Sequence, residues 1–401
     1  MLDIVLCFIL GCLFGIITGL TPGIHTNTVA AMVLSFLPIL TKWFSPLALA
    51  VLLTSMVVVH SFVDFIPTIF LGAPDEGETS LSVLPGHAML LQGRGYDALK
   101  LTVVGGVGAT LFALVLLPFF CAAIFYGYDK VSRFIPFIIL LLSLFFILKE
   151  KSLKSKIWAV LIFLFSGVLG VLTLNVLPVK DPLFPLLTGL FGIPTLIISL
   201  FGKNKIVEQK INDQIAFKGN WANSLKASLS AASMSVLPAM GAAQATILAQ
   251  YLSRKSSKEA FLTMVGGINS SSAIFVLTTL WLIGRARTGV LAVLKQFLEL
   301  SFREYVLLLL ASLVAVGFAV LITLVLGKVF SKKLSKIKYR KLVFFILLFL
   351  FILVLILSGP LGLLICSVGA AIGLIAPLVG TARIHAMACI AIPVIFYFFG
   401  M

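Results

Sequence analysis

The chain has 401 residues, of which 61% are hydrophobic and only 11% are charged, and its mean hydropathy is +1.18. A soluble domain carries about 25% charged residues, so this composition excludes the soluble classes and indicates a polytopic membrane protein. The formal net charge is +16, but the basic residues stand in short runs between apolar segments, where orientation signals lie. No nucleic-acid partner is therefore expected.

The apolar runs predict an all-α membrane protein with about ten to twelve segments, since a span needs about 20 apolar residues. The predicted segments are 2–41, 46–71, 100–127, 134–149, 156–177, 183–202, 220–252, 261–283, 303–327, 342–358, 361–378 and 385–400. Segments 2–41 and 220–252 are too long for one span and too short for two spans with a loop. Each of these two predicts a helical hairpin or a discontinuous helix.

The first long segment is broken in its middle by proline and small polar residues. Broken backbone exposes amides and carbonyls, which membrane proteins tolerate only where protein or a water-filled cavity satisfies them. The free amides and the dipole at the start of the following helix attract anions. We therefore expect an anion-binding site formed by Thr21, Pro22, Gly23, His25, Thr26 and Asn27.

Asp64 is an acidic residue inside the second apolar segment, 46–71, and His60 precedes it by four residues. On a helix the two side chains share one face. An ionisable group at this depth is costly and marks a functional site by default. The pair is expected to exchange a proton or to help bind a cation; the alternative is a self-satisfied pair that only locks packing.

The loop after that segment is acidic, with Asp75, Glu76 and Glu78 followed by hydroxyl residues. Carboxylates with hydroxyls and carbonyls suit a hard cation such as Na⁺. The same cluster equally fits the first turn of a helix, which its dipole would stabilise. Further along, Gly105, Gly106 and Gly108 predict close contact between helices.

Four basic loops indicate the orientation of the spans, if all of them face the cytoplasm. They lie at 149–156, 203–218, 254–258 and 328–341. On this count, segment 220–252 enters and leaves on one side, and segment 2–41 is a hairpin that opens the other way. This predicts an inverted repeat, with residues 1–202 as the first copy and 203–401 as the second.

The second hairpin is broken at Pro238, and Gly241 and Gln244 are its expected substrate ligands. Interruptions at corresponding positions of two halves are the best sequence indication of a secondary transporter's binding site. Downstream, the run Gly266–Ser272 is rich in small and hydroxyl residues. It favours an unwound segment over a packing seam, with Asn269 and Ser270 as further ligands.

Arginine and histidine near the span ends complete the candidates. Arg285 follows segment 261–283 and offers a fork of donors for a carboxylate or phosphate. Arg287 and Arg383 are at least as well explained as anchors at span ends, and His385 lies beside Arg383 near the C-terminus. The five cysteines, none in a CxxC pair, are expected to be small buried residues.

No enzyme is expected, since none of the four histidines forms HExxH and no GxSxG elbow occurs. No cofactor and no metal is expected, apart from a transported Na⁺ or H⁺.

Three stretches resemble the large membrane subunit of tripartite tricarboxylate transporters, the TctA family. They are Pro22–Ile24, Phe70–Leu101 and Pro238–Gly241. The resemblance implies carboxylate transport driven by a sodium or proton gradient, with both proline motifs forming the substrate site. Typical members work with a small membrane subunit and a periplasmic binding protein. The chain is most similar to the shorter, stand-alone archaeal-type members, and it departs from the pattern at His25, Ala239 and Leu71-Gly72.

The expected function is therefore secondary transport of a small organic anion, a di- or tricarboxylate, coupled to Na⁺ or H⁺ by alternating access. The expected location is a prokaryotic plasma membrane, as a multi-pass protein, with a homodimer left open. The alternative is a polyprenyl-phosphate translocase, in which Arg285 and His25 would hold the phosphate and the 34 phenylalanines would suit a lipid tail.

Overall fold

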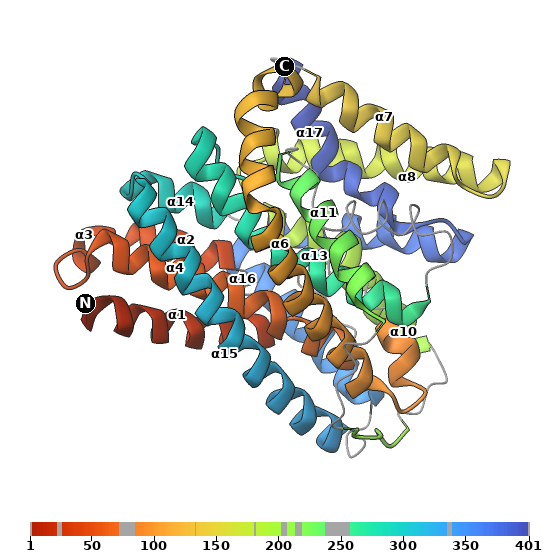
Figure 1. Cartoon of the computed structure of the whole chain (residues 1–401). Coiled ribbons are helices and arrows are strands. Elements are labelled where there is room, and N and C mark those ends of the chain that lie inside the picture. Colours follow the sequence, from red (N-terminus) through yellow and green to blue (C-terminus); the bar gives the residue numbers. More distant parts are fainter. Residues whose placement is uncertain are drawn as a thin grey trace.

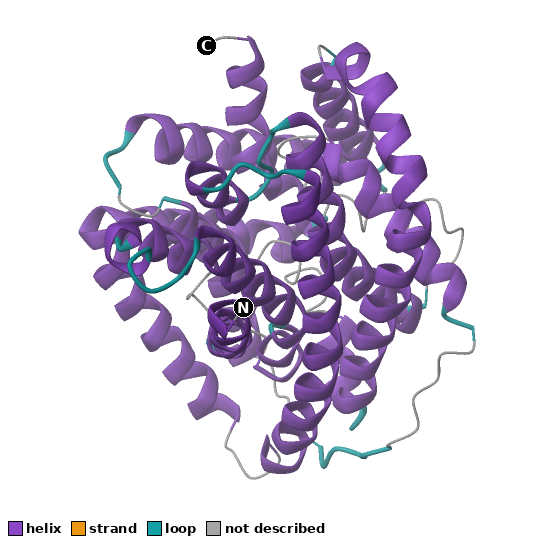
Figure 2. Cartoon of the chain, turned by 60° about the vertical axis from the view of Figure 1, so that its left-hand side comes forward, coloured by secondary structure: helices purple, strands orange, loops and turns teal. Residues whose placement is uncertain are grey.

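The computed structural model describes residues 2–21, 26–71, 85–132, 134–179, 182–201, 207–212, 219–236, 257–334 and 339–399. These residues form helices and loops and no strand, as Figure 2 shows. Seven of their helices are long and apolar enough to cross a bilayer: 2–20, 46–71, 95–128, 153–176, 258–283, 302–333 and 343–379. The prediction of an all-helical, polytopic membrane protein is confirmed.

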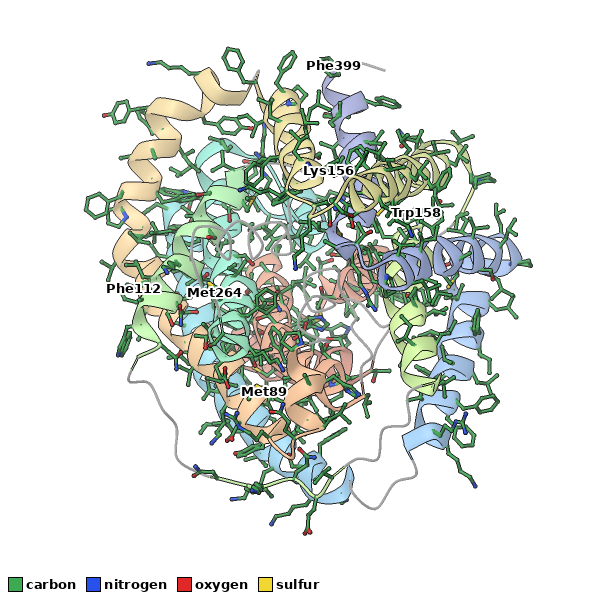
Figure 3. All side chains as sticks on the ribbon, turned by 90° about the vertical axis from the view of Figure 1, so that its right-hand side faces the viewer. Met89, Phe112, Lys156, Trp158, Met264 and Phe399 are labelled. Atoms are coloured by element: carbon green, nitrogen blue, oxygen red, sulfur yellow. The ribbon has the colours of Figure 1, made fainter. Side chains whose placement is uncertain are left out.

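The outer faces of these helices are covered with large apolar side chains. Val115 is 67% exposed, Phe119 71% and Leu321 68%. A contiguous apolar surface of this kind is a liability in water, whereas lipid tails solvate it. Met89 and Met264, both labelled in Figure 3, are by contrast buried in the interior between helices.

The first predicted hairpin segment returns to the level at which it begins. It comprises α1 (Leu2–Leu20), α2 (Thr26–Ser35) and the short α3 (Leu37–Leu40), and it is followed by α4 (Pro46–Val63). Ser45, the N-cap of α4, donates its hydroxyl to Asp3 at 2.7 Å and accepts from the Ala48 amide at 3.3 Å. Since Asp3 lies in the first turn of α1, the two ends of the segment meet.

α1 and α4 pack along a row of glycines. Gly11, Gly15 and Gly19 lie one turn apart on α1, and a Cβ on Gly15 would stand 2.7 Å from the carbonyl oxygen of Met56. Glycine at these positions lets the two backbones approach closely, as small residues do at helix interfaces in membranes.

The two helices that flank residues 237–256 in the sequence begin close together. α11 (Trp221–Val236) begins next to Asn220, and α13 (Lys258–Ile283) is the next helix among the described residues. The Thr263 hydroxyl, in the second turn of α13, lies 3.3 Å from the Asn220 side-chain oxygen. The start of α11 and the start of α13 are thus at one level.

The expectation of an unwound segment at Gly266–Ser272 is wrong. α13 runs as a regular helix through all of these residues. Two of their hydroxyls bond to carbonyls within the helix: Ser271 bonds to Gly267 and Ser272 to Asn269, at 2.7 and 2.8 Å. These two residues therefore need no open backbone. The glycines form a packing seam with α6 (Gly95–Ser132), where a Cβ on Gly266 would collide with the backbone of Thr102. The predicted close contact at Gly105 is confirmed, since it packs against the backbone of Thr263.

The remaining helices of the first half are α7 (Ile135–Leu148), α8 (Leu153–Val171) with η2 (Leu172–Val176), then α9 (Leu183–Leu187), η3 (Thr188–Gly192) and α10 (Ile193–Phe201). Those of the second half are α14 (Gly289–Phe297), α15 (Phe302–Leu334), α16 (Tyr339–Val379), η4 (Arg383–Met387) and α17 (Ala388–Phe399). α16 joins two predicted segments across a bend at Gly359, whose φ of 71° favours glycine.

Several helices of the first half each pack against a helix of the second half. α13 lies on α6, and α4 lies on α15. α8 lies on α17, and α16 lies on α9 and η3. Figure 1 shows α6 rising to the top of the molecule and α15 descending to its lower edge, so these two long helices run in opposite directions. The core of the protein is therefore built from both halves together.

Candidate functional site

Asp64 lies at the point where α4 loses its regular form. Its amide donates to the His60 carbonyl at 3.0 Å, so it closes α4 as C-cap. Pro67, three residues on, has no N–H to continue the helix, and a π-helical turn, η1 (Pro67–Leu71), follows. The Thr68 hydroxyl donates to the Asp64 carbonyl at 2.7 Å. Such turns occur often at functional sites.

The Asp64 carboxylate is fully buried and faces the second half of the chain. Its side chain is 0% exposed. Asn269 of α13 donates from Nδ2 to the Ser61 carbonyl at 3.2 Å and lies 3.5 Å from Asp64 Oδ2. A carboxylate of one half thus meets an amide of the other, inside two membrane helices.

His60 extends this cluster toward α1. The ring is 3% exposed, and its Nδ1 lies 3.0 Å from the hydroxyl of Thr18. That hydroxyl donates to the Gly15 carbonyl at 3.3 Å, so it is left to accept from an Nδ1–H of the ring. His60 and Asp64 are thus both buried, His60 in contact with α1 and Asp64 with α13, and their action as a pair stays a prediction.

Ser270 adds a hydroxyl that lacks a bonding partner. It is 4% exposed, and its Oγ has no hydrogen-bond partner among the described residues. It lies against the α6 backbone, because a Cβ on Gly106 would stand 2.7 Å from that oxygen. A buried hydroxyl without a partner costs about 1–3 kcal/mol, and this cost is removed when a ligand bonds to it.

We call Thr18, His60, Asp64, Asn269 and Ser270 the central polar cluster. It offers a carboxylate, an imidazole, an amide and hydroxyls, all buried, on α1, α13 and the C-terminal end of α4. These groups can hold a proton or supply oxygen ligands to Na⁺. In the part of the chain that the structure describes, no three His, Cys, Asp or Glu side chains gather as a metal site.

Asn27 and Arg285, two of the predicted substrate ligands, contact α14 and α6 respectively. Thr26 begins α2 and is 4% exposed, and the Asn27 Oδ1 accepts from the Val290 amide of α14 at 3.1 Å. Arg285 is exposed, and its guanidinium lies 5.3 Å from the centre of the Tyr128 ring. Thr21 follows the end of α1 and donates its amide to Ile17 at 3.0 Å.

Several predicted site residues lie outside the described residues, and for them the assignments stay predictions. They are Pro22, Gly23, His25, Asp75, Glu76, Glu78, Pro238, Gly241 and Gln244.

Sequence reasoning missed Thr18 and the partner of His385. Thr18 stands as a single hydroxyl in the apolar run of α1, three residues before the first break, and gives little signal. Glu150 accepts from the Ala382 amide at 3.0 Å and lies 2.9 Å from His385 Nε2. This acid was hidden by the lysines on either side of it, which favoured a purely basic loop. His385 therefore ties the α7–α8 turn to η4 in addition to marking a span end.

Replacing Asn269 with alanine should destabilise the protein by about 1–3 kcal/mol, because the Ser61 carbonyl and the Asp64 carboxylate both lose a buried donor. Thermal unfolding in detergent measures this loss. The matched control is Ser272→Ala on the same helix, whose hydroxyl, among the described residues, bonds to the Asn269 carbonyl of α13 itself. An Asn269→Ala protein as stable as this control would contradict the contact between the two halves.

Comparison with known proteins gives one family. A family model described as the tripartite tricarboxylate transporter TctA family matches residues 5–388. An uncharacterized protein of Methanocaldococcus jannaschii is 31% identical over 408 residues, an alignment that covers 98% of this chain and 98% of that protein. No solved structure matches the chain.

Proposed function

The chain belongs to the tripartite tricarboxylate transporter TctA family, and from this premise we propose that it is a secondary transporter of a di- or tricarboxylate, driven by a Na⁺ or H⁺ gradient. The protein is a multi-pass membrane protein of a transporter family. We place it in the plasma membrane of a prokaryote. The family supports neither an enzymatic role nor the polyprenyl-phosphate alternative.

The observation that carries the proposal is the contact between Asp64 and Asn269. A fully buried carboxylate in a membrane helix is costly, so such a residue marks a functional site by default. This one faces the opposite half of the chain across 3.5 Å. Binding of a cation or proton at Asp64 therefore changes the charge at a junction between halves, which is where an ion must act to influence their relative movement.

We assign ion coupling to the central polar cluster. Asp64 supplies the charge and His60 a second titratable group. Asn269 donates its amide toward Asp64 Oδ2, and Ser270 supplies a neutral hydroxyl oxygen. The acidic loop residues Asp75, Glu76 and Glu78 remain candidates for guiding or binding the ion. Loss of the carboxylate charge should therefore uncouple the protein without unfolding it.

We assign substrate binding to the helix ends that flank the two breaks. The N-terminus of α2 carries Thr26 and Asn27, and helix N-termini attract carboxylates. Thr21, Pro22, Gly23 and His25 precede it in the sequence. The proposed ligands from the second half are Pro238, Gly241, Gln244 and Arg285.

The proposed mechanism is alternating access by an inverted repeat of residues 1–202 and 203–401. The packing supports it, because the helices correspond in order. α4 packs on α15 as α13 packs on α6, and α8 packs on α17 as α16 packs on η3. Each of the two long segments is also bracketed by a contact between the residues before and after it: Asp3 with Ser45, and Asn220 with Thr263.

The test is uptake of a panel of labelled di- and tricarboxylates into liposomes that contain the purified protein. Each substrate is measured with an imposed sodium gradient, a proton gradient, or none. The proposal predicts that one gradient drives accumulation of at least one carboxylate. Absence of uptake across the panel, from a folded protein, would remove the proposal.

A further inference from the structure

The turn between α13 and α14, residues 284–290, touches helix ends from both broken hairpins. On one side it contacts Val236, the last residue of α11, which stands two positions before Pro238. On the other side it contacts Asn27, in the first turn of α2, four positions after Gly23. We call residues 284–290 the clasp turn. Figure 1 shows α14, which begins in this turn, beside α2.

Arg287 makes the contact to α11. Its Nη2 donates to the Val236 carbonyl at 2.6 Å and to the Tyr128 hydroxyl at 3.1 Å. The last carbonyls of a helix have no partner within the helix and attract a cation. Burial lowers the pKa of Arg287, but an arginine keeps its charge near neutral pH. The two bonds of Nη2 hold the guanidinium against α11 and α6. The Nε of Arg287 has no partner among the described residues.

Asn27 makes the contact to α14. Its Oδ1 accepts the Val290 amide at 3.1 Å, while Thr288, the N-cap of α14, accepts the Leu291 amide at 3.3 Å. One cap of α14 thus comes from its own turn and one from the first hairpin. Gly289 makes room for this arrangement, because a Cβ there would lie 2.7 Å from Asn27 Cγ.

Apolar packing fixes α14 against the first hairpin as well. Val290 and Val293 lie in one buried cluster with Ala30 and Val33 of α2 and Leu49 of α4. α14 is thus attached to the first hairpin, although it follows α13 in the sequence. The clasp turn is then bonded at its middle to α11 and at its end to α2.

We propose that Arg287 and Asn27 are positioning residues that hold the helix ends flanking the two breaks in one fixed register throughout transport. This rests on the proposed function, in which those helix ends bind the substrate. The clasp turn then stays closed in every state, and the movement of one half of the chain against the other takes place around it.

A reversible covalent tie tests the closed clasp. Asn27→Cys and Gly289→Cys are combined in a chain whose five native cysteines are replaced by serine or alanine. The Asn27 Cγ occupies the place of a sulfur atom facing Gly289, and a disulfide needs a Cβ–Cβ separation of about 3.5–4.5 Å. We expect the disulfide to form on mild oxidation. Because Asn27 is a proposed substrate ligand, the double variant itself should take up less carboxylate than the unchanged protein. Oxidation should leave this remaining uptake within about twofold of that of the same variant in its reduced state, since a closed clasp needs no opening step.

The opposite result would overturn the proposal. If oxidation of the double variant stops uptake and a reductant restores it, the clasp turn opens during the transport cycle. If no carboxylate is transported, the rate of disulfide formation alone tests whether the clasp turn stays closed. The rate of disulfide formation should then be the same with sodium, with citrate and with neither. A rate that changes several-fold with the ion or the acid shows an opening clasp, so failure of the clasp is distinguished from failure of the transport function.

The role of Arg287 is tested by Arg287→Gln and Arg287→Lys. Loss of a charge-assisted hydrogen bond at the α11 end should raise KM by about tenfold while the maximal rate per folded protein changes little. Lysine, which keeps the charge, should restore part of the loss. Arg303→Gln, at an exposed arginine of α15, is the matched control. A merely structural role for Arg287 would lower the amount of folded protein and leave KM unchanged, and that result would contradict the positioning role.

Discussion

Asp64→Asn is expected to reduce gradient-driven carboxylate uptake to the level of liposomes without protein. The carboxylate is the fully buried charge of the central polar cluster, and the amide that replaces it can neither take up a proton nor balance the charge of Na⁺. The two side chains have nearly the same shape, so packing against Asn269 is kept. The side-chain oxygen of the new amide can also accept the hydrogen bond that Asn269 Nδ2 offers to Asp64 Oδ2.

Three measurements make this result specific. The unfolding temperature of Asp64→Asn in detergent should equal or exceed that of the unchanged protein. Exchange of labelled for unlabelled carboxylate, without any gradient, should survive to a larger degree than accumulation. Glu208→Gln, which neutralises an exposed carboxylate outside the membrane helices, should leave uptake unchanged. Full accumulation by Asp64→Asn would remove Asp64 from the coupling site.

Gly266→Ala is expected to have the largest effect on folding of any single methyl group added to α13. The new Cβ would collide with the backbone of Thr102, and a backbone atom cannot move away by a change of rotamer. α6 and α13 would have to separate along a seam that also contains Gly105 and Thr263. Overpacking typically costs about 1–3 kcal/mol, and we expect the upper end of this range.

The control is Gly317→Ala on α15, where an added Cβ meets nothing within 4 Å. Alanine is favoured over glycine in a helix by about 1 kcal/mol, so this change should be neutral or stabilising. Yield, monodispersity and unfolding temperature of the two variants in the same detergent give the comparison. Equal behaviour of the two proteins would contradict the close approach of α6 and α13.

Hydropathy and proline predicted the membrane segments well, because lipid contact imposes a long apolar run on each helix. The predicted segment 46–71 agrees with the span that the structure contains. The ends of α6 were harder to place, since Tyr96, Asp97 and Lys100 are polar yet helical. There the helix continues past the apolar run, stabilised by an ion pair of 3.0 Å between Lys100 and Asp97.

The composition of the candidate site was easier to predict than its pairing. His60 and Asp64 stood out because they are ionisable residues within an apolar run. Asn269 was expected in an unwound substrate site, because glycine and serine occur both at breaks and at tight helix contacts. Its actual neighbour, Asp64, is 205 residues away in sequence, and only the packing of α4 on α13 brings the two together.

The most direct test of coupling is the reverse flux in liposomes that contain the protein. A carboxylate gradient is imposed with no initial sodium or proton gradient, and movement of sodium or pH change across the membrane is followed. Linked binding of ion and substrate is reciprocal, so the proposed mechanism predicts that the carboxylate flow drives one of the two ions uphill, and that Asp64→Asn abolishes this ion movement. Carboxylate flow without movement of either ion would contradict coupled transport.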